Sequence, residues 1–135
     1  MTNQGARKAV ADGAWTGRLH QAREFHASAR SLVTLADNRS YNGAITLMVA
    51  AAIGYADAIT AKFKGVVNKR DHQTAPRLLR EVLNARLPDK QERFFRRILG
   101  RKDEVGYGAR GTSLEEALQL LTELDDFADW VETAL

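Results

Sequence analysis

The sequence contains no cysteine and only two prolines in 135 residues. Without cysteine, neither a disulfide framework nor a thiolate metal site is possible, which suits a protein of a reducing compartment. The scarcity of proline, together with many Ala, Leu and Arg and few β-branched runs, favours helix over sheet. At this length we expect one domain with a single buried core.

The sequence also lacks a hydrophobic run long enough to span a membrane. The longest, residues 44–56, has about 13 residues, whereas about 20 are needed to cross a bilayer. The first residues, MTNQGARKAVADGAW, are polar and lack the apolar segment of a signal peptide. We therefore expect a soluble, cytoplasmic protein in which residues 44–56 belong to a central core helix.

Basic residues are absent from the last 24 residues, 112–135, which contain seven acidic ones. Residues 1–111 contain all 20 Lys and Arg against 10 Asp and Glu, a net charge of +10. Such asymmetry can indicate a surface that faces nucleic acid. It can equally indicate a basic face and an acidic face that pair within one bundle or across a dimer. Charge alone does not choose between these interpretations.

The spacing of apolar residues predicts an all-α fold, an antiparallel (up-and-down) bundle of about five helices. We expect a flexible N-terminus over residues 1–13, where nothing apolar repeats, and a single helical bundle domain over residues 14–135. The expected helices cover residues 14–37, 41–64, about 71–85, from 88 to a glycine-containing turn after Arg101, and from about 112 to 135.

The last expected helix begins with two overlapping capping boxes, Thr112 with Glu115 and Ser113 with Glu116. Its apolar seam continues regularly to the C-terminus. Leu120, Phe127 and Trp130 fall off that seam and predict a second apolar face for a partner.

Isolated titratable residues have ordinary structural explanations. His26 lies on an apolar stripe and is expected to be a core histidine with satisfied hydrogen bonds. Asp57, within the most buried helix, is expected either to pair with a base or to belong to a site. His72 follows a helix-capping residue and is expected to be solvated. Neither a metal-binding Glu-x-x-His pattern nor a Gly-x-Ser-x-Gly nucleophile motif is present, so no metal or cofactor is indicated.

A basic stripe is the main candidate for binding. It is formed by Arg93, Arg96, Arg97, Arg101 and Lys102. The stripe is either a solvated helix face that complements the helix dipole or a surface that contacts phosphates. Tyr107 lies close by in sequence and could stack on a base.

Three segments resemble the HEPN domain (higher eukaryotes and prokaryotes nucleotide-binding) over residues 15–135. The first is Tyr41 and the alanine-rich stretch that ends Tyr55-Ala-Asp57-Ala. The others are Lys102-Asp-Glu-Val-Gly-Tyr107-Gly, and Ser113-Leu-Glu-Glu-Ala117 with a final helix that contains Phe127 and Trp130.

The resemblance implies a helical bundle that often dimerises. Many HEPN domains are metal-independent endoribonucleases of toxin–antitoxin and defence systems, often accompanied by a nucleotidyltransferase antitoxin. Others have lost catalysis and bind nucleotide, RNA or protein. The family motif is an Arg, a polar residue and a His four to six residues after the Arg. Here Lys102, Asp103 and Tyr107 reproduce the frame, with Arg101 as the other candidate for the cation, but the His is missing.

We therefore expect a homodimeric, HEPN-like bundle without strong catalysis. It would bind RNA, a nucleotide or a partner protein around Arg97, Arg101, Lys102 and Tyr107. One alternative is an active metal-independent endoribonuclease toxin that uses Arg101 or Lys102 with Tyr107. Another is a purely structural dimeric interaction module.

Overall fold

The computed structural model describes residues 7–35, 40–69, 72–107 and 111–135, with the backbone alone for residues 103–107. Within these ranges the chain forms five α-helices: α1 (Ala14–Thr34), α2 (Asn42–Lys64), α3 (Ala75–Leu83), α4 (Asp89–Tyr107) and α5 (Leu114–Ala134). Short 3₁₀ helices, η2 (His72–Thr74) and η3 (Asn84–Arg86), flank α3. The prediction of an all-α bundle is confirmed.

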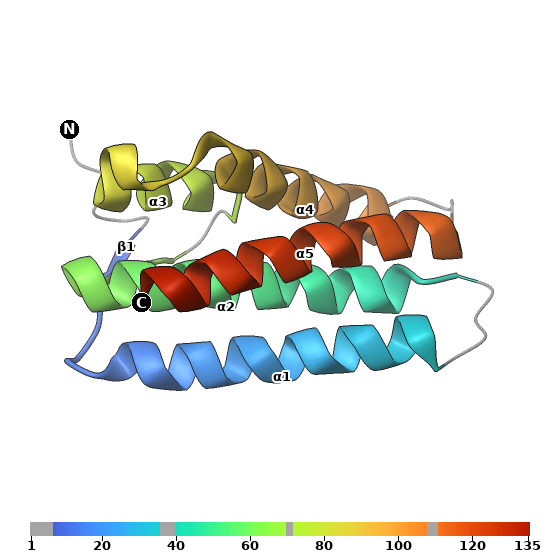
Figure 1. The fold of residues 1–135 in the computed structure, drawn as a ribbon, viewed down its shortest axis with the longest axis horizontal. Helices are drawn as coiled ribbons and strands as arrows, with labels where there is room; N and C mark the ends of the chain where they lie inside the picture. Colours follow the sequence, from blue (N-terminus) through green and yellow to red (C-terminus); the bar gives the residue numbers. More distant parts are fainter. Residues whose placement is uncertain (1–6, 36–39, 70–71, 108–110) are drawn as a thin grey trace.

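Helix α2 is the centre of the bundle. α1 lies along one side and α3 and α4 along the opposite side, with α2 and α5 between them (Figure 1), and α2 contacts all four other helices. Ile45, Met48 and Ile59 of α2 are completely buried. By length and composition α2 could cross a membrane, but 67% of its apolar window is buried inside the bundle. It therefore behaves as the core helix that the sequence predicted.

Small residues allow α1 and α2 to approach closely. Ala22 and Ala29 of α1 are fully buried, and Gly54 of α2 lies directly against Ala22. A Cβ added at Gly54 would lie only 2.9 Å from the Cβ of Ala22. Glycine is required there by the interhelical distance.

Part of the segment expected to be a flexible N-terminus, residues 1–13, forms a short strand. Strand β1 (Arg7–Ala9) pairs antiparallel with β2 (Val66–Asn68), and Ala9 lies opposite Val66. The backbone N–H of Val10 also donates to the carbonyl of Gly65, at 2.9 Å. Three residues are too few to give a periodic signal, and their partner lies far along the chain. Residues 1–6 lie outside the described part of the chain.

Helix α4 is longer than expected. The sequence suggested a glycine-containing turn soon after Arg101, but α4 continues to Tyr107 and includes Lys102 and Asp103. A glycine inside a helix costs only about 1 kcal/mol. Burial of Ile98 and Leu99 and contacts with α5 offset that cost.

The prediction of a second apolar face on α5 is wrong. Leu120 and Phe127 are buried, Phe127 stacks on Phe95 of α4 at 5.1 Å between ring centroids, and Trp130 packs against the core. α5 contacts both α2 and α4, so its core-facing surface is wider than a single seam. Its N-terminus is capped by Ser113, whose Oγ accepts from the backbone N–H of Glu116 at 3.1 Å.

Candidate functional site

The basic stripe lies along α4 as predicted, but its members have different surroundings. Arg93 is exposed and makes no ion pair within the described part of the chain. Arg96 is also exposed and donates to Glu92, one turn earlier, at 2.9 Å. These two arginines form the solvated part of the stripe.

Arg97 and Arg101 reach across to the acidic helix α5. The Nη2 atom of Arg97 lies 3.0 Å from Oε2 of Glu123, whose side chain is only 3% exposed. Gln119 donates to the same oxygen at 3.1 Å. Arg101 Nη2 lies 3.0 Å from Oε2 of Glu116. These contacts show a basic and an acidic face pairing within one bundle, one of the interpretations that the charge asymmetry left open.

Arg101 is also tied to the end of the bundle. Its Nη2 lies 3.5 Å from the hydroxyl of Thr112. The buried Thr112 hydroxyl donates to Oδ1 of Asn42 at 2.5 Å, and the backbone N–H of Tyr41 donates to the Thr112 carbonyl at 3.1 Å. Arg101 therefore helps to join α4, α5 and the start of α2, a role that the sequence did not suggest.

An open groove of about 570 Å³ lies between α4 and α5. Arg97, Gly100 and Arg101 line one side, and residues of the first two turns of α5 line the other. Gly100 contributes no side chain, and a Cβ there would meet nothing within 4 Å. The groove has cationic and acidic walls and is not uniformly basic.

Lys102 faces a different direction, because successive residues of a helix are rotated by about 100°. Its Nζ lies 3.1 Å from Nδ1 of His72, which belongs to η2. Gln73 of η2 also donates to the carbonyl of Leu99, at 3.5 Å. An ammonium can only donate, so Nδ1 of His72 accepts and the ring proton is on Nε2. The structure thus places a histidine beside the motif lysine.

The other two predicted motif residues, Asp103 and Tyr107, belong to α4 by their backbone. Their side chains lie outside the described part of the structure.

His26 is the satisfied core histidine that the sequence predicted. Its Nδ1 lies 2.8 Å from the hydroxyl of Tyr55 and its Nε2 lies 2.7 Å from Oδ1 of Asp125. Arg30 donates to the same carboxylate oxygen. Burial raises the pKa of Tyr55 to about 12, so its hydroxyl stays protonated and donates to His26. Tyr55 is 2% exposed, and the cluster links α1, α2 and α5.

Asp57 forms the ion pair expected of a buried carboxylate. Its Oδ2 lies 3.6 Å from Nη1 of Arg18, and it accepts from the backbone N–H of Asn68 in β2. Burial nevertheless raises the pKa of Asp57 to about 7. The carboxylate joins α2 to α1 and to the small sheet.

Within the described ranges no three His, Asp or Glu side chains gather where a metal ion could bind. No protein-family model and no curated protein matches the sequence.

Proposed function

We propose that this chain is a HEPN-like helical domain of the cytoplasm that binds the phosphate backbone of RNA near the C-terminal part of α4. The contact between Lys102 and His72, 3.1 Å long, carries the proposal. It puts a cation and an imidazole side by side at a point where α4 meets a segment outside the bundle's long helices. The resemblance in sequence suggests a toxin–antitoxin or defence context.

Of the basic stripe, Arg93 and Lys102 have no carboxylate partner among the described residues, and Lys102 is the one that lies beside a histidine. Arg96, Arg97 and Arg101 each have a carboxylate partner, whereas the exposed ammonium of Lys102 contacts the imidazole of His72. Its charge is therefore not balanced by an acid in that contact. Its other two N–H groups make no hydrogen bond among the described residues, so they can contact an anion. A charge-assisted bond to a phosphate oxygen, with release of counterions, would follow.

His72 adds an aromatic ring to this site. An imidazole offers a flat face on which an unpaired base can stack. Base stacking favours single-stranded RNA over a free inorganic anion.

The test is binding of a labelled single-stranded oligoribonucleotide, followed by fluorescence anisotropy over a range of salt concentrations. We expect Lys102→Ala to weaken binding by about fivefold and to lower the salt slope by about 1, as loss of one phosphate contact should. Lys64→Ala is the matched control, because it removes an exposed lysine at the end of α2. Equal affinities of both variants for the oligoribonucleotide would contradict the proposal. They would favour the alternative in which the chain is a purely structural interaction module.

The Lys102–His72 contact also favours the second candidate, a metal-independent endoribonuclease. In such a reaction Lys102 moves to a phosphate and Nδ1 of His72 takes the proton of a ribose 2′-hydroxyl. The 2′-oxygen then attacks phosphorus, the P–O5′ bond breaks, and the imidazole returns a proton to O5′. Lys102 stabilises the charge that develops on the phosphoryl oxygens. Arg101, held by Glu116 and Thr112, is less suited to that role.

Cleavage is tested by incubating labelled RNA with the protein in the presence of EDTA. Activity that survives EDTA and disappears in His72→Ala, but persists in His20→Ala, would support the ribonuclease. His20 is a fair control because it is an exposed histidine on α1, paired only with Glu24 one turn away. Intact RNA with retained binding would reject the ribonuclease and keep the binding domain.

A further inference from the structure

The three side chains of η2 connect it to two other elements of the fold. His72 and Gln73 both contact α4. Thr74 turns to the small sheet instead, and its hydroxyl donates to Oδ1 of Asn68 in β2 at 2.9 Å. The segment that carries His72 is therefore attached to α4 on one side and to β2 on the other.

The contact of Thr74 with β2 replaces the usual role of a threonine at this position. Thr74 is the N-cap residue of α3, but its side chain makes no capping hydrogen bond. An N-cap threonine ordinarily has an extended backbone, and its oxygen accepts from a backbone N–H of the first turn. The backbone of Thr74 has φ −87° and ψ −8°, and the hydroxyl points to Asn68. The side chain thus joins η2 to the sheet and does not begin α3.

The partner of Thr74 is itself held by two helices. The backbone N–H of Asn68 donates to the buried carboxylate of Asp57 in α2. In the sheet, Asn68 lies opposite Arg7 of β1, and Arg7 forms an ion pair with Glu81 of α3. Two short strands alone are marginally stable at best, so these contacts with α2 and α3 fix the position of β2.

We propose that Asn68 and Thr74 are positioning residues for the RNA site. The hydrogen bond between their side chains fixes η2, and with it the imidazole of His72, against α4 beside Lys102. A ring whose orientation is set before binding loses little freedom when a base stacks on it. The part in RNA binding rests on the function proposed above, whereas the placement of His72 can be measured without RNA.

The placement is tested by nuclear magnetic resonance of the His72 side chain in the RNA-free protein. Lys102→Ala should shift the His72 signals of the wild type, because it removes the neighbouring ammonium. In a Thr74→Val background the same substitution should shift them much less, since the ring is no longer held beside position 102. Thr74→Ser retains the hydroxyl and should restore the response.

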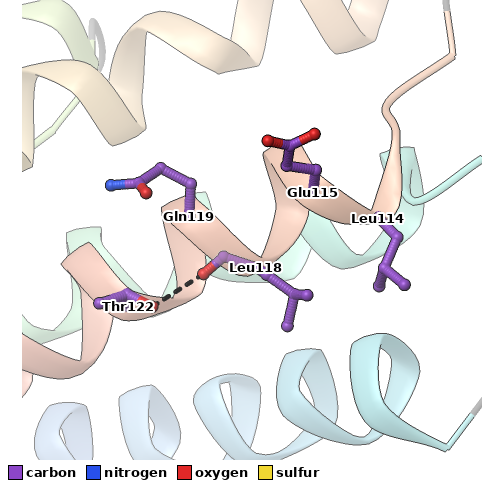
Figure 2. Close-up of a pocket in the computed structure, with 5 residues that line it drawn as sticks. All are labelled: Leu114, Glu115, Leu118, Gln119 and Thr122. Atoms are coloured by element: carbon purple, nitrogen blue, oxygen red, sulfur yellow. Dashed lines mark hydrogen bonds between the residues drawn. The ribbon is translucent and has the colours of Figure 1, made fainter.

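Two more variants separate positioning from a general loss of stability. Asn68→Ala removes the same hydrogen bond through its other partner, so it should suppress the response of His72 as Thr74→Val does. Thr122→Val is the matched control. This exposed threonine donates to the carbonyl of Leu118 within α5 at 3.0 Å (Figure 2), away from the contacts that hold η2. It should leave the response of His72 unchanged.

RNA binding gives the second measurement. Thr74→Val should weaken binding of the single-stranded oligoribonucleotide by about fivefold, at the lower end of what one base–aromatic stack contributes. Its salt slope should equal that of the wild type, because Lys102 remains available to a phosphate. A loss of affinity without a change of slope distinguishes misplacement of His72 from loss of the lysine.

An equal response of His72 to Lys102→Ala with and without the Thr74 hydroxyl overturns the inference, whatever the RNA measurement shows. Wild-type RNA affinity in Thr74→Val overturns it as well. A response that is lost in Thr74→Val and restored in Thr74→Ser supports it. If the wild type then binds no RNA, only the proposed function fails, and Asn68 and Thr74 still position His72.

Discussion

Arg97 on α4 and Glu123 on α5 form an ion pair in which the carboxylate is buried and the guanidinium is exposed. Their atoms lie 3.0 Å apart, and the side chains are 61% and 3% exposed, respectively. A buried carboxylate without a cation is costly. Part of the basic stripe therefore stabilises the bundle, and the RNA contact that we propose involves Lys102 instead.

Replacing Arg97 should destabilise the fold more than replacing its neighbour on the same stripe. We expect Arg97→Ala to lower the free energy of unfolding by about 2 kcal/mol, less than for a fully buried pair because Arg97 is largely solvated. Arg93→Ala, which removes an exposed arginine without an ion pair, should change it by less than about 0.5 kcal/mol. Urea unfolding measures both, and equal effects would show that the pair with Glu123 is unimportant.

Two glycines of α2 should respond oppositely to alanine. At Gly54 the new Cβ would lie 2.9 Å from that of Ala22, so Gly54→Ala should destabilise by about 1–3 kcal/mol through overpacking. At Gly43 nothing lies within 4 Å of an added Cβ, so Gly43→Ala should stabilise by about 0.5–1 kcal/mol. Thermal unfolding of the two variants measures both changes in stability. A stabilising Gly54→Ala would refute the close contact of α1 with α2.

Asp57 should make stability fall as pH rises. Burial raises the pKa of Asp57 from 3.8 to about 7, so the folded chain holds a proton that the unfolded chain releases. The contribution of Asp57 to the free energy of unfolding is complete below about pH 4 and is lost as the pH rises through 7. Between pH 5 and 7 the loss should be about 2 kcal/mol.

Asp57→Asn isolates this effect, because the other titrating groups remain in both proteins. The difference in unfolding free energy between variant and wild type should change across pH 5 to 7. Hydrogen bonds from arginines lower the pKa of Glu92 and Glu132. Protonation of these two carboxylates therefore affects stability below pH 5, where stability falls as the pH falls. A difference that does not change with pH would contradict the raised pKa of Asp57.

The hydroxyl of Tyr55 should stabilise the fold through His26. Tyr55→Phe removes the donor that lies 2.8 Å from Nδ1 of His26, and we expect a loss of about 1–2 kcal/mol. In His26→Phe the same tyrosine substitution should cost less, because the partner is already gone. A double-mutant cycle measures the coupling, and two effects that simply add would exclude the hydrogen bond.

The periodicity of apolar residues was enough to predict the helical bundle and its central helix. Helix ends were harder to predict near glycines. Gly65 does end α2, in a left-handed conformation with φ of 65°, but α4 continues to Tyr107, where the sequence suggested a glycine-containing turn. Strand β1 was missed because its stability depends on pairing with β2, a contact that no local pattern reports.

The candidate site was predictable only in part. The motif frame identified Lys102, but His72 was set aside because its closeness to Lys102 exists only in the fold. The charge asymmetry indicated that basic and acidic faces could pair, yet it did not assign Arg97 to Glu123. On α5 the spacing of Leu120 and Phe127 suggested that they lie outside the core-facing seam. They are buried because a helix packed against two neighbours buries a wider face than a single seam.

The most direct test of the proposed RNA site is nuclear magnetic resonance of the three histidine side chains during titration with a single-stranded oligoribonucleotide. We expect the His72 signals to shift progressively with RNA, while those of His20 on the exposed face of α1 and of His26 in its cluster with Tyr55 and Asp125 do not. Loss of the His72 shift in Lys102→Ala would connect it to the lysine. Unchanged His72 signals at saturating RNA, or equal shifts of all three histidines, would contradict it.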